Sequence, residues 1–171
     1  MNEENLQQLK AFGYSTTENK KHYTFDEALM AMAKFAGKAV EYFDRSCSIE
    51  DDLISQGLMD GSIKQFENFT ESFKDIITMY MIECGNQVPQ YLSDCIRFIR
   101  KTSELNSYEM GITELMYSRN KIVHEYYNME FMTEEFKTAM TNYADGLKDL
   151  CKTINTLVDS KNLREHRIYK K

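Results

Sequence analysis

Apolar side chains recur along most of this chain at spacings of three and four residues, the period of a helix with one buried face. Four long segments carry the pattern: residues 24–44, 62–84, 111–130 and 133–157. Shorter helices are expected at residues 5–12, 49–58 and 89–101. The pattern predicts an all-α fold, an antiparallel up-and-down bundle of four long helices with short extra helices between them.

Capping signals predict where several helices begin and end. Thr24 and Glu27 have the spacing of a capping box, which predicts a helix start at Thr24. Gly85 predicts the end of a long helix, because glycine adopts the left-handed conformation of a C-cap without strain. Pro89 suits the first turn of the following helix, and Thr133 suits the N-cap of the last one.

The domain organisation follows from where the pattern starts and stops. Residues 1–23 are polar and weakly periodic, residues 24–158 form one predicted bundle, and residues 159–171 form a basic tail. For the tail we expect a solvated, frayed end rather than an RNA-binding arm. Within the bundle, Asp60 and Gly61 predict a break between two helices.

Composition supports a helical, single-domain protein. One proline and seven glycines in 171 residues leave few of the turns that an all-β fold needs. The four cysteines lie far apart without a CxxC pair, so we expect reduced core or boundary thiols and no zinc site. No apolar run approaches the roughly 20 residues of a membrane span, and the start lacks a signal segment, so we expect a cytoplasmic protein.

The net charge of −6 argues against broad, non-specific adhesion to nucleic acid, but it allows a small local site. Positive charge is concentrated mid-chain at Arg97, Arg100, Lys101, Arg119 and Lys121. These side chains form an anion-attracting cleft if their helices are neighbours. The alternative for the first three is that they solvate a helix end and interact favourably with its dipole.

One segment, residues 111–130, places polar groups on a stripe that is otherwise apolar. The stripe consists of Ile112, Leu115, Met116, Ile122, Val123 and Tyr126. Arg119 falls on it, and a buried arginine needs a carboxylate, a carbonyl or an anionic ligand. A salt-bridged structural arginine is the alternative. Tyr126 lies about two turns from Arg119 and so projects from nearly the same face.

A second face of this segment carries His124. It lies about 140° round the helix from Arg119, where it aligns with Tyr117, Asn120 and Tyr127. If this face met its own copy across a two-fold axis, the histidines and arginines of two chains would share one cleft. The alternative is a structural histidine with its hydrogen bonds satisfied.

The order Arg119, Asn120, His124, Tyr126 resembles the R-x4-H-x-Y signature of HEPN-domain proteins, in particular HepT-type toxins paired with small nucleotidyltransferase antitoxins. Residues 60–77 also resemble the helix that precedes this motif in the HEPN subfamily described as nucleotidyltransferase substrate-binding proteins. The resemblance covers roughly residues 24–156. It implies a HEPN-like bundle that dimerises and cuts RNA without a metal.

The residue types suit that chemistry. His124 can accept and return a proton near neutral pH, and Arg119 can stabilise a charged phosphorane through two parallel hydrogen bonds. Asn120 can orient the His124 ring or contact the phosphate. No metal and no cofactor is expected. The resemblance implies that the nucleotidyltransferase partner attaches AMP to Tyr126, and Tyr127 ranks second because it lies on another face.

Three functions remain open at this point. The chain is a ribonuclease toxin of a toxin–antitoxin pair if the site is catalytic. If the helical bundle binds a partner but catalyses no reaction, the chain is instead a non-catalytic HEPN binding module. It would then be the partner or substrate-binding subunit of a nucleotidyltransferase. A helical adaptor without chemistry would have Arg119 sealed in a salt bridge and His124 isolated.

Overall fold

The computed structural model describes residues 3–16, 23–124 and 129–169, with the side chains of residues 123–132 outside this description. The chain folds into helices with one minor two-stranded sheet, which confirms the all-α prediction. The longer helices are α2 (Phe25–Ser48), α3 (Asp52–Glu83), α5 (Glu109–His124) and α6 (Met129–Ser160). The shorter elements are α1 (Glu3–Ala11), α4 (Leu92–Lys101), the 3-10 helix η1 (Asn106–Tyr108), and strands β1 (Tyr23–Thr24) and β2 (Arg167–Ile168).

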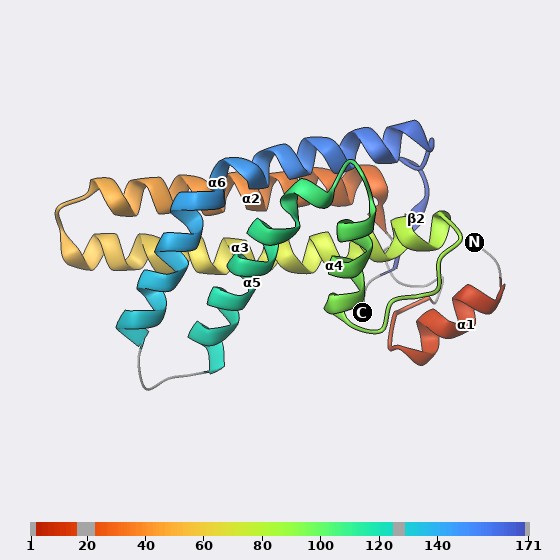
Figure 1. Cartoon of the computed structure of the whole chain (residues 1–171), viewed down its shortest axis with the longest axis horizontal. Helices are drawn as coiled ribbons and strands as arrows, with labels where there is room; N and C mark the ends of the chain where they lie inside the picture. Colours follow the sequence, from red (N-terminus) through yellow and green to blue (C-terminus); the bar gives the residue numbers. More distant parts are fainter. Residues whose placement is uncertain (1–2, 17–22, 125–128, 170–171) are drawn as a thin grey trace.

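The longer helices form two antiparallel pairs (Figure 1). Helices α2 and α3 lie side by side, and the C-terminal half of α6 runs along α2. The N-terminal half of α6 pairs with α5, and together they cross α3 and extend beyond it. The end of α5 that carries His124 therefore projects from the α2–α3 pair. None of the described helices combines the length and the hydrophobicity that a membrane span requires.

A ladder of phenylalanines forms the centre of the core. Phe66 and Phe69 of α3 are stacked with ring centroids 5.6 Å apart, and Phe69 stacks on Phe73 at 5.8 Å. Phe136 of α6 meets Phe66 edge to face at 5.9 Å. All four rings are fully buried, so they hold α3 against its neighbours and cannot stack on bases.

Helix α3 passes through Asp60 and Gly61 without a break, so the predicted interruption is wrong. A Cβ at Gly61 would lie 2.9 Å from a ring carbon of Tyr42 on α2, so the glycine permits this close approach. The hydroxyl of the next residue, Ser62, is buried and donates to the Ala39 carbonyl at 2.7 Å. Packing against α2 thus overrides the local propensity to break.

Two predicted helix ends are confirmed. The N–H of Glu27 donates to the Thr24 hydroxyl at 3.2 Å, and the N–H of Thr24 donates to the Glu27 carboxylate at 3.1 Å, which completes the capping box. Gly85 has a φ of 79° and follows α3 directly after its cap residue. Both signals are local, which explains why the sequence alone was sufficient.

Two predicted helix starts are wrong. Helix α4 begins at Leu92, after Pro89, because the Asp94 side chain accepts the N–H of Tyr91 at 3.0 Å and so caps the helix later in the chain. Helix α6 begins at Met129 and runs through Thr133, which is therefore an interior residue. Pairing with α5 lengthens α6 beyond its apparent capping signal.

The C-terminal tail is packed on the bundle as far as Tyr169, so the expected frayed end is wrong for the described residues. Strand β2 pairs antiparallel with β1, with Ile168 opposite Tyr23. The side chains of Leu163 and Ile168 are buried. These apolar side chains cover the start of α2, which explains why a basic segment becomes ordered.

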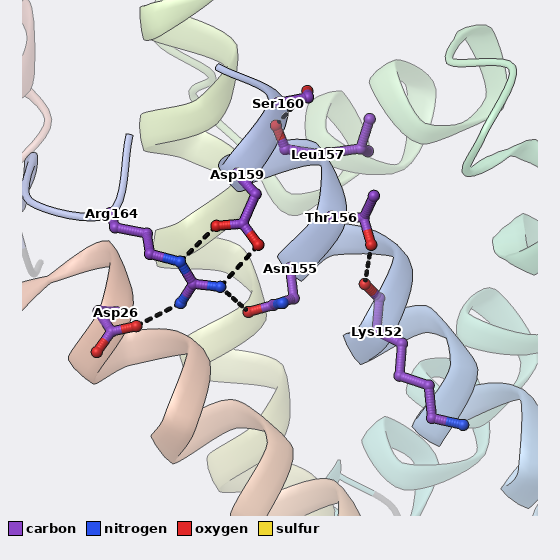
Figure 2. Close-up of polar contacts among 8 residues, drawn as sticks. All are labelled: Asp26, Lys152, Asn155, Thr156, Leu157, Asp159, Ser160 and Arg164. Carbon is purple, nitrogen blue, oxygen red and sulfur yellow. Dashed lines mark hydrogen bonds and ion pairs between the residues drawn. The ribbon is translucent and has the colours of Figure 1, made fainter. Parts of the chain in front are cut away.

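Arg164 connects this tail to α2 and α6 through ion pairs and a hydrogen bond (Figure 2). Its guanidinium forms ion pairs with Asp26 at the start of α2 and with Asp159 at the end of α6, and it donates to Asn155 Oδ1 at 3.1 Å. The backbone N–H of Asp26 also donates to the Arg164 carbonyl at 3.1 Å. The tail therefore supplies backbone acceptors to the free N–H groups at the N-terminus of α2, and Arg164 pairs with the acidic side chain there.

The four cysteines are free, as the sequence predicts. Cys95 and Cys151 are buried, as expected, but Cys47 and Cys84 are exposed, so the expected core or boundary position is wrong for these two. Burial raises the pKa of Cys95 to about 11 and that of Cys151 to about 12, so both buried thiols are protonated and unreactive at neutral pH.

The close approach at Gly61 predicts different outcomes for alanine substitution at two glycines of α3. Gly57 is exposed, and a Cβ there meets nothing within 4 Å, so Gly57→Ala should stabilise the protein by about 0.5–1 kcal/mol. Gly61→Ala gains the same helix propensity but displaces the Tyr42 ring, so it should be clearly less stable than Gly57→Ala. Urea denaturation of both variants measures the difference. Equal stabilisation would contradict the packing described here.

Candidate functional site

Helix α5 has two unlike faces, as predicted, over the positions whose side chains are described. Ile112, Leu115 and Met116 are buried on the inner face. On the outer face Tyr117 is 63% exposed and Asn120 is exposed. Arg119 belongs to the inner face, with a side chain that is 18% exposed. It is therefore largely enclosed but still reachable from solvent.

The Arg119 guanidinium is held on two sides. Its Nη2 forms an ion pair of 2.6 Å with Glu67 Oε1 on α3, and its Nη1 donates to Asn120 Oδ1 at 3.0 Å. Its Nε is shielded from solvent and has no hydrogen-bond partner among the described residues. A guanidinium has two N–H groups on each terminal nitrogen, so each of these nitrogens retains one donor for a further acceptor.

Glu67 shares its carboxylate between two cations. Its second oxygen accepts from Lys64 Nζ at 2.9 Å, one turn earlier on α3. The hydrogen bond from Lys64 and the charge of Arg119 lower the pKa of Glu67. One carboxylate between two cations leaves the Lys64–Glu67–Arg119 cluster with one net positive charge, which an anion can still recognise.

The outer face of α5 lies beside an acidic cleft. Lys121 forms an ion pair of 2.9 Å with Glu135 of α6, and its ammonium lies 4.8 Å from the centre of the Tyr117 ring. The cleft beside them has a volume of 370 Å³ and is bordered by Glu114 and Glu134. Its carboxylates disfavour a polyanion within this cleft.

The predicted site residues are only partly within the described structure. Arg119 and Asn120 lie together on α5, and α5 ends at His124. The His124 side chain, Tyr126 and Tyr127 lie outside the described residues. Five positions of helix separate Arg119 from His124, or about 7.5 Å along the axis.

The other mid-chain cations do not gather around Arg119. Arg97 pairs with Asp94 at 3.5 Å, and Arg100 pairs with Glu109 at 2.6 Å at the start of α5. Ten positions, or about 15 Å of helix, separate Glu109 from Arg119. The structure therefore favours the second interpretation, in which these cations serve the C-terminal end of α4.

A separate groove of 560 Å³ lies between α2 and α6. Its surface is mostly apolar, with Leu29 and Met30 from one helix and Cys151 from the other. Lys152 and Arg164 border it, and both are already paired with carboxylates. It contains none of the motif residues, so the Arg119 cluster is the stronger candidate site.

Sequence reasoning missed Glu67 and Lys64. It required a carboxylate, a carbonyl or an anion for Arg119 but could not choose among the 27 acidic residues. The usable signal was that Glu67 lies between Phe66 and Phe69, beside the buried stripe of α3. A carboxylate at such a boundary position can reach a cation on a crossing helix.

No family model, curated protein or solved structure matches the chain. Among the described residues no three potential metal ligands lie together. The functional assignment therefore depends on the motif and on the geometry around Arg119.

The shared carboxylate predicts how the pKa of Glu67 responds to substitution. Lys64→Met and Arg119→Met should each raise it toward its usual value of 4.5, with the larger change from Lys64 because its hydrogen bond is the main cause of the shift. Since the folded-state pKa is lowered, the contribution of the carboxylate to stability is present above pH 4.5 and is lost as the pH falls through the lowered pKa.

Carboxyl titration by NMR measures these shifts. Arg100→Met serves as the control, because Arg100 pairs with Glu109 and not with Glu67. An unchanged Glu67 pKa in the Arg119 variant would show that the two side chains are not paired in solution.

Proposed function

We propose that this chain is a HEPN-type, metal-independent ribonuclease, the toxin of a toxin–antitoxin pair. Its antitoxin is a small nucleotidyltransferase that attaches AMP to Tyr126. The main support is the state of Arg119: it is fixed by Glu67 and Asn120, partly open to solvent, and retains unused donors. The ion pair with Glu67 is also what a structural arginine would have, so the proposal depends on the solvent opening and the unused donors together with the motif.

The proposed reaction is cleavage of RNA by its own 2′-hydroxyl. His124 takes the 2′-hydroxyl proton, the oxygen attacks phosphorus, and the bond to the 5′-oxygen breaks. A proton from imidazolium completes the leaving 5′-hydroxyl, and the other product is a 2′,3′-cyclic phosphate. Arg119 stabilises the charge that accumulates on the phosphorane oxygens.

Two chains are proposed to form one cleft by bringing their α5 helices together. Met110 and Tyr117 support this arrangement, because both are large apolar side chains more than 60% exposed on the outer face of α5. A two-fold axis beside this face would cover them and would bring two copies of His124 toward one phosphodiester. One imidazole can then accept a proton while the other donates one.

A second candidate is a non-catalytic HEPN module that binds a nucleotidyltransferase. It is favoured by the pairing of Arg97, Arg100, Arg119 and Lys121 with carboxylates, which leaves little free positive charge for RNA on a chain of net charge −6. It requires the same helices but no proton transfer by His124.

RNA cleavage by the purified protein distinguishes these two functions. The wild-type protein should cut single-stranded RNA in the presence of EDTA and leave 2′,3′-cyclic phosphate ends. His124→Ala and Arg119→Ala should each lower the rate by about 100-fold or more, as expected for the loss of a general base or of an electrostatic stabiliser. Arg97→Ala, which removes a paired cation on α4, should cleave like the wild type.

The outcomes of this assay are unambiguous once circular dichroism shows that each variant is folded. Cleavage that persists unchanged in both motif variants would remove the assigned site. Absence of cleavage by the folded, unmodified wild-type protein would favour the binding module.

Modification by the partner gives an independent test. Incubated with its nucleotidyltransferase and ATP, the protein should gain the mass of one adenylyl group at Tyr126 and lose RNA cleavage. The negative charge of the added phosphate competes with the RNA phosphate for Arg119, and the bulk of the adenylyl group blocks the site. Tyr126→Phe should stay unmodified and active, whereas Tyr127→Phe should be modified like the wild type. Modification of Tyr127 alone would contradict the assignment.

A further inference from the structure

We propose that Glu67 of α3 is the positioning residue that orients Arg119 toward the RNA phosphate. This inference rests on the proposed ribonuclease function and adds to it a residue that lies outside the R-x4-H-x-Y motif. It assigns the carboxylate no contact with the substrate. Its role is to fix the direction of the guanidinium.

The geometry favours positioning by an anchored carboxylate. The backbone of Glu67 is fixed, because Phe66 and Phe69 on either side of it are fully buried in the core. From this position its Oε1 lies 2.6 Å from Arg119 Nη2, while Asn120 Oδ1 accepts from Nη1 at 3.0 Å. Two acceptors on different nitrogens fix the plane of the guanidinium as well as its position.

The same contacts leave the guanidinium able to bind a phosphate. Each terminal nitrogen keeps one N–H, so a phosphate oxygen can contact Arg119 without rupture of the Glu67 ion pair. The charge is also favourable, because Lys64 offsets the carboxylate at 2.9 Å. Without Lys64, the negative charge of Glu67 would offset the positive charge of Arg119. The attraction of Arg119 for a phosphate would then be weaker.

Positioning and inhibition make opposite predictions for Glu67. If the carboxylate merely occupied Arg119 in the free protein, its removal would release the guanidinium and tighten the binding of RNA. If it positions Arg119, its removal lets the guanidinium rotate away, which weakens transition-state stabilisation more than substrate binding.

Steady-state cleavage kinetics of Glu67→Gln test the proposal. The amide keeps the shape and an acceptor oxygen but loses the charge, so kcat should fall by about 10-fold to 100-fold with KM changed much less. Glu71→Gln is the matched control: it removes the same charge one turn further along α3, from an exposed residue that forms no ion pair with Arg119. It should behave like the wild type.

A second variant shows whether Glu67 acts through Arg119. Arg119→Lys keeps the positive charge but lacks the planar fork, so adding Glu67→Gln to it should lower kcat by much less than in the wild-type background. Thermal denaturation of each variant checks that it is folded at the assay temperature. A merely structural role would give the same loss in both backgrounds.

The kinetic results distinguish a failure of the positioning role of Glu67 from a failure of the proposed ribonuclease function. Wild-type kcat in Glu67→Gln, or a lower KM with kcat retained, would overturn the positioning role while leaving the ribonuclease intact. Equal losses in the wild-type and Arg119→Lys backgrounds would also overturn it. Absence of cleavage by the wild-type protein would contradict the proposed function, and the inference would fall with it.

Discussion

The ion pair between Arg119 and Glu67 is the contact that connects the fold to the candidate site. It joins α5 to the middle of α3. The guanidinium that it holds lies on a helix stripe whose other side chains are apolar and buried. Such a cation is tolerated only with a partner, and Glu67 supplies it at 2.6 Å. Because Lys64 shares the carboxylate, the cluster keeps a net positive charge in a protein whose overall charge is negative. This local charge is the basis for proposing a phosphate ligand.

The fold determines where that carboxylate lies. Glu67 has a fixed direction because α3 is one uninterrupted helix and because Phe66 and Phe69 lock its inner face. The helix remains continuous where Tyr42 of α2 packs over Gly61. On the other side, the pairing of α5 with α6 carries Arg119 across α3 and leaves the end of α5 projecting. The site thus depends on packing between helices that are far apart in the sequence.

The sequence predicted the features that are encoded locally. Helical periodicity indicated the bundle and the two faces of α5, and the capping box at Thr24 formed as its spacing requires. It failed where distant segments decide the structure. Nothing near Gly61 reveals the Tyr42 ring, and nothing in the basic tail reveals that Arg164 pairs with Asp26, 138 positions away. The partner of Arg119 was hidden for the same reason: the need for a carboxylate was evident, but its identity depended on how α5 crosses α3.

Arg119, held by Glu67, is proposed to bind a phosphodiester. NMR of the arginine side-chain N–H groups tests this proposal directly when a single-stranded DNA oligonucleotide, which lacks the 2′-hydroxyl and cannot be cleaved, is added at low salt. The Nε–H of Arg119 is shielded from solvent, so its signal should be observable in the free protein. This signal should shift as the oligonucleotide binds, and the shift should be lost when the oligonucleotide is replaced by an uncharged backbone analogue. An Arg119 signal that stays in place while Arg97 or Arg100 responds would contradict the proposal.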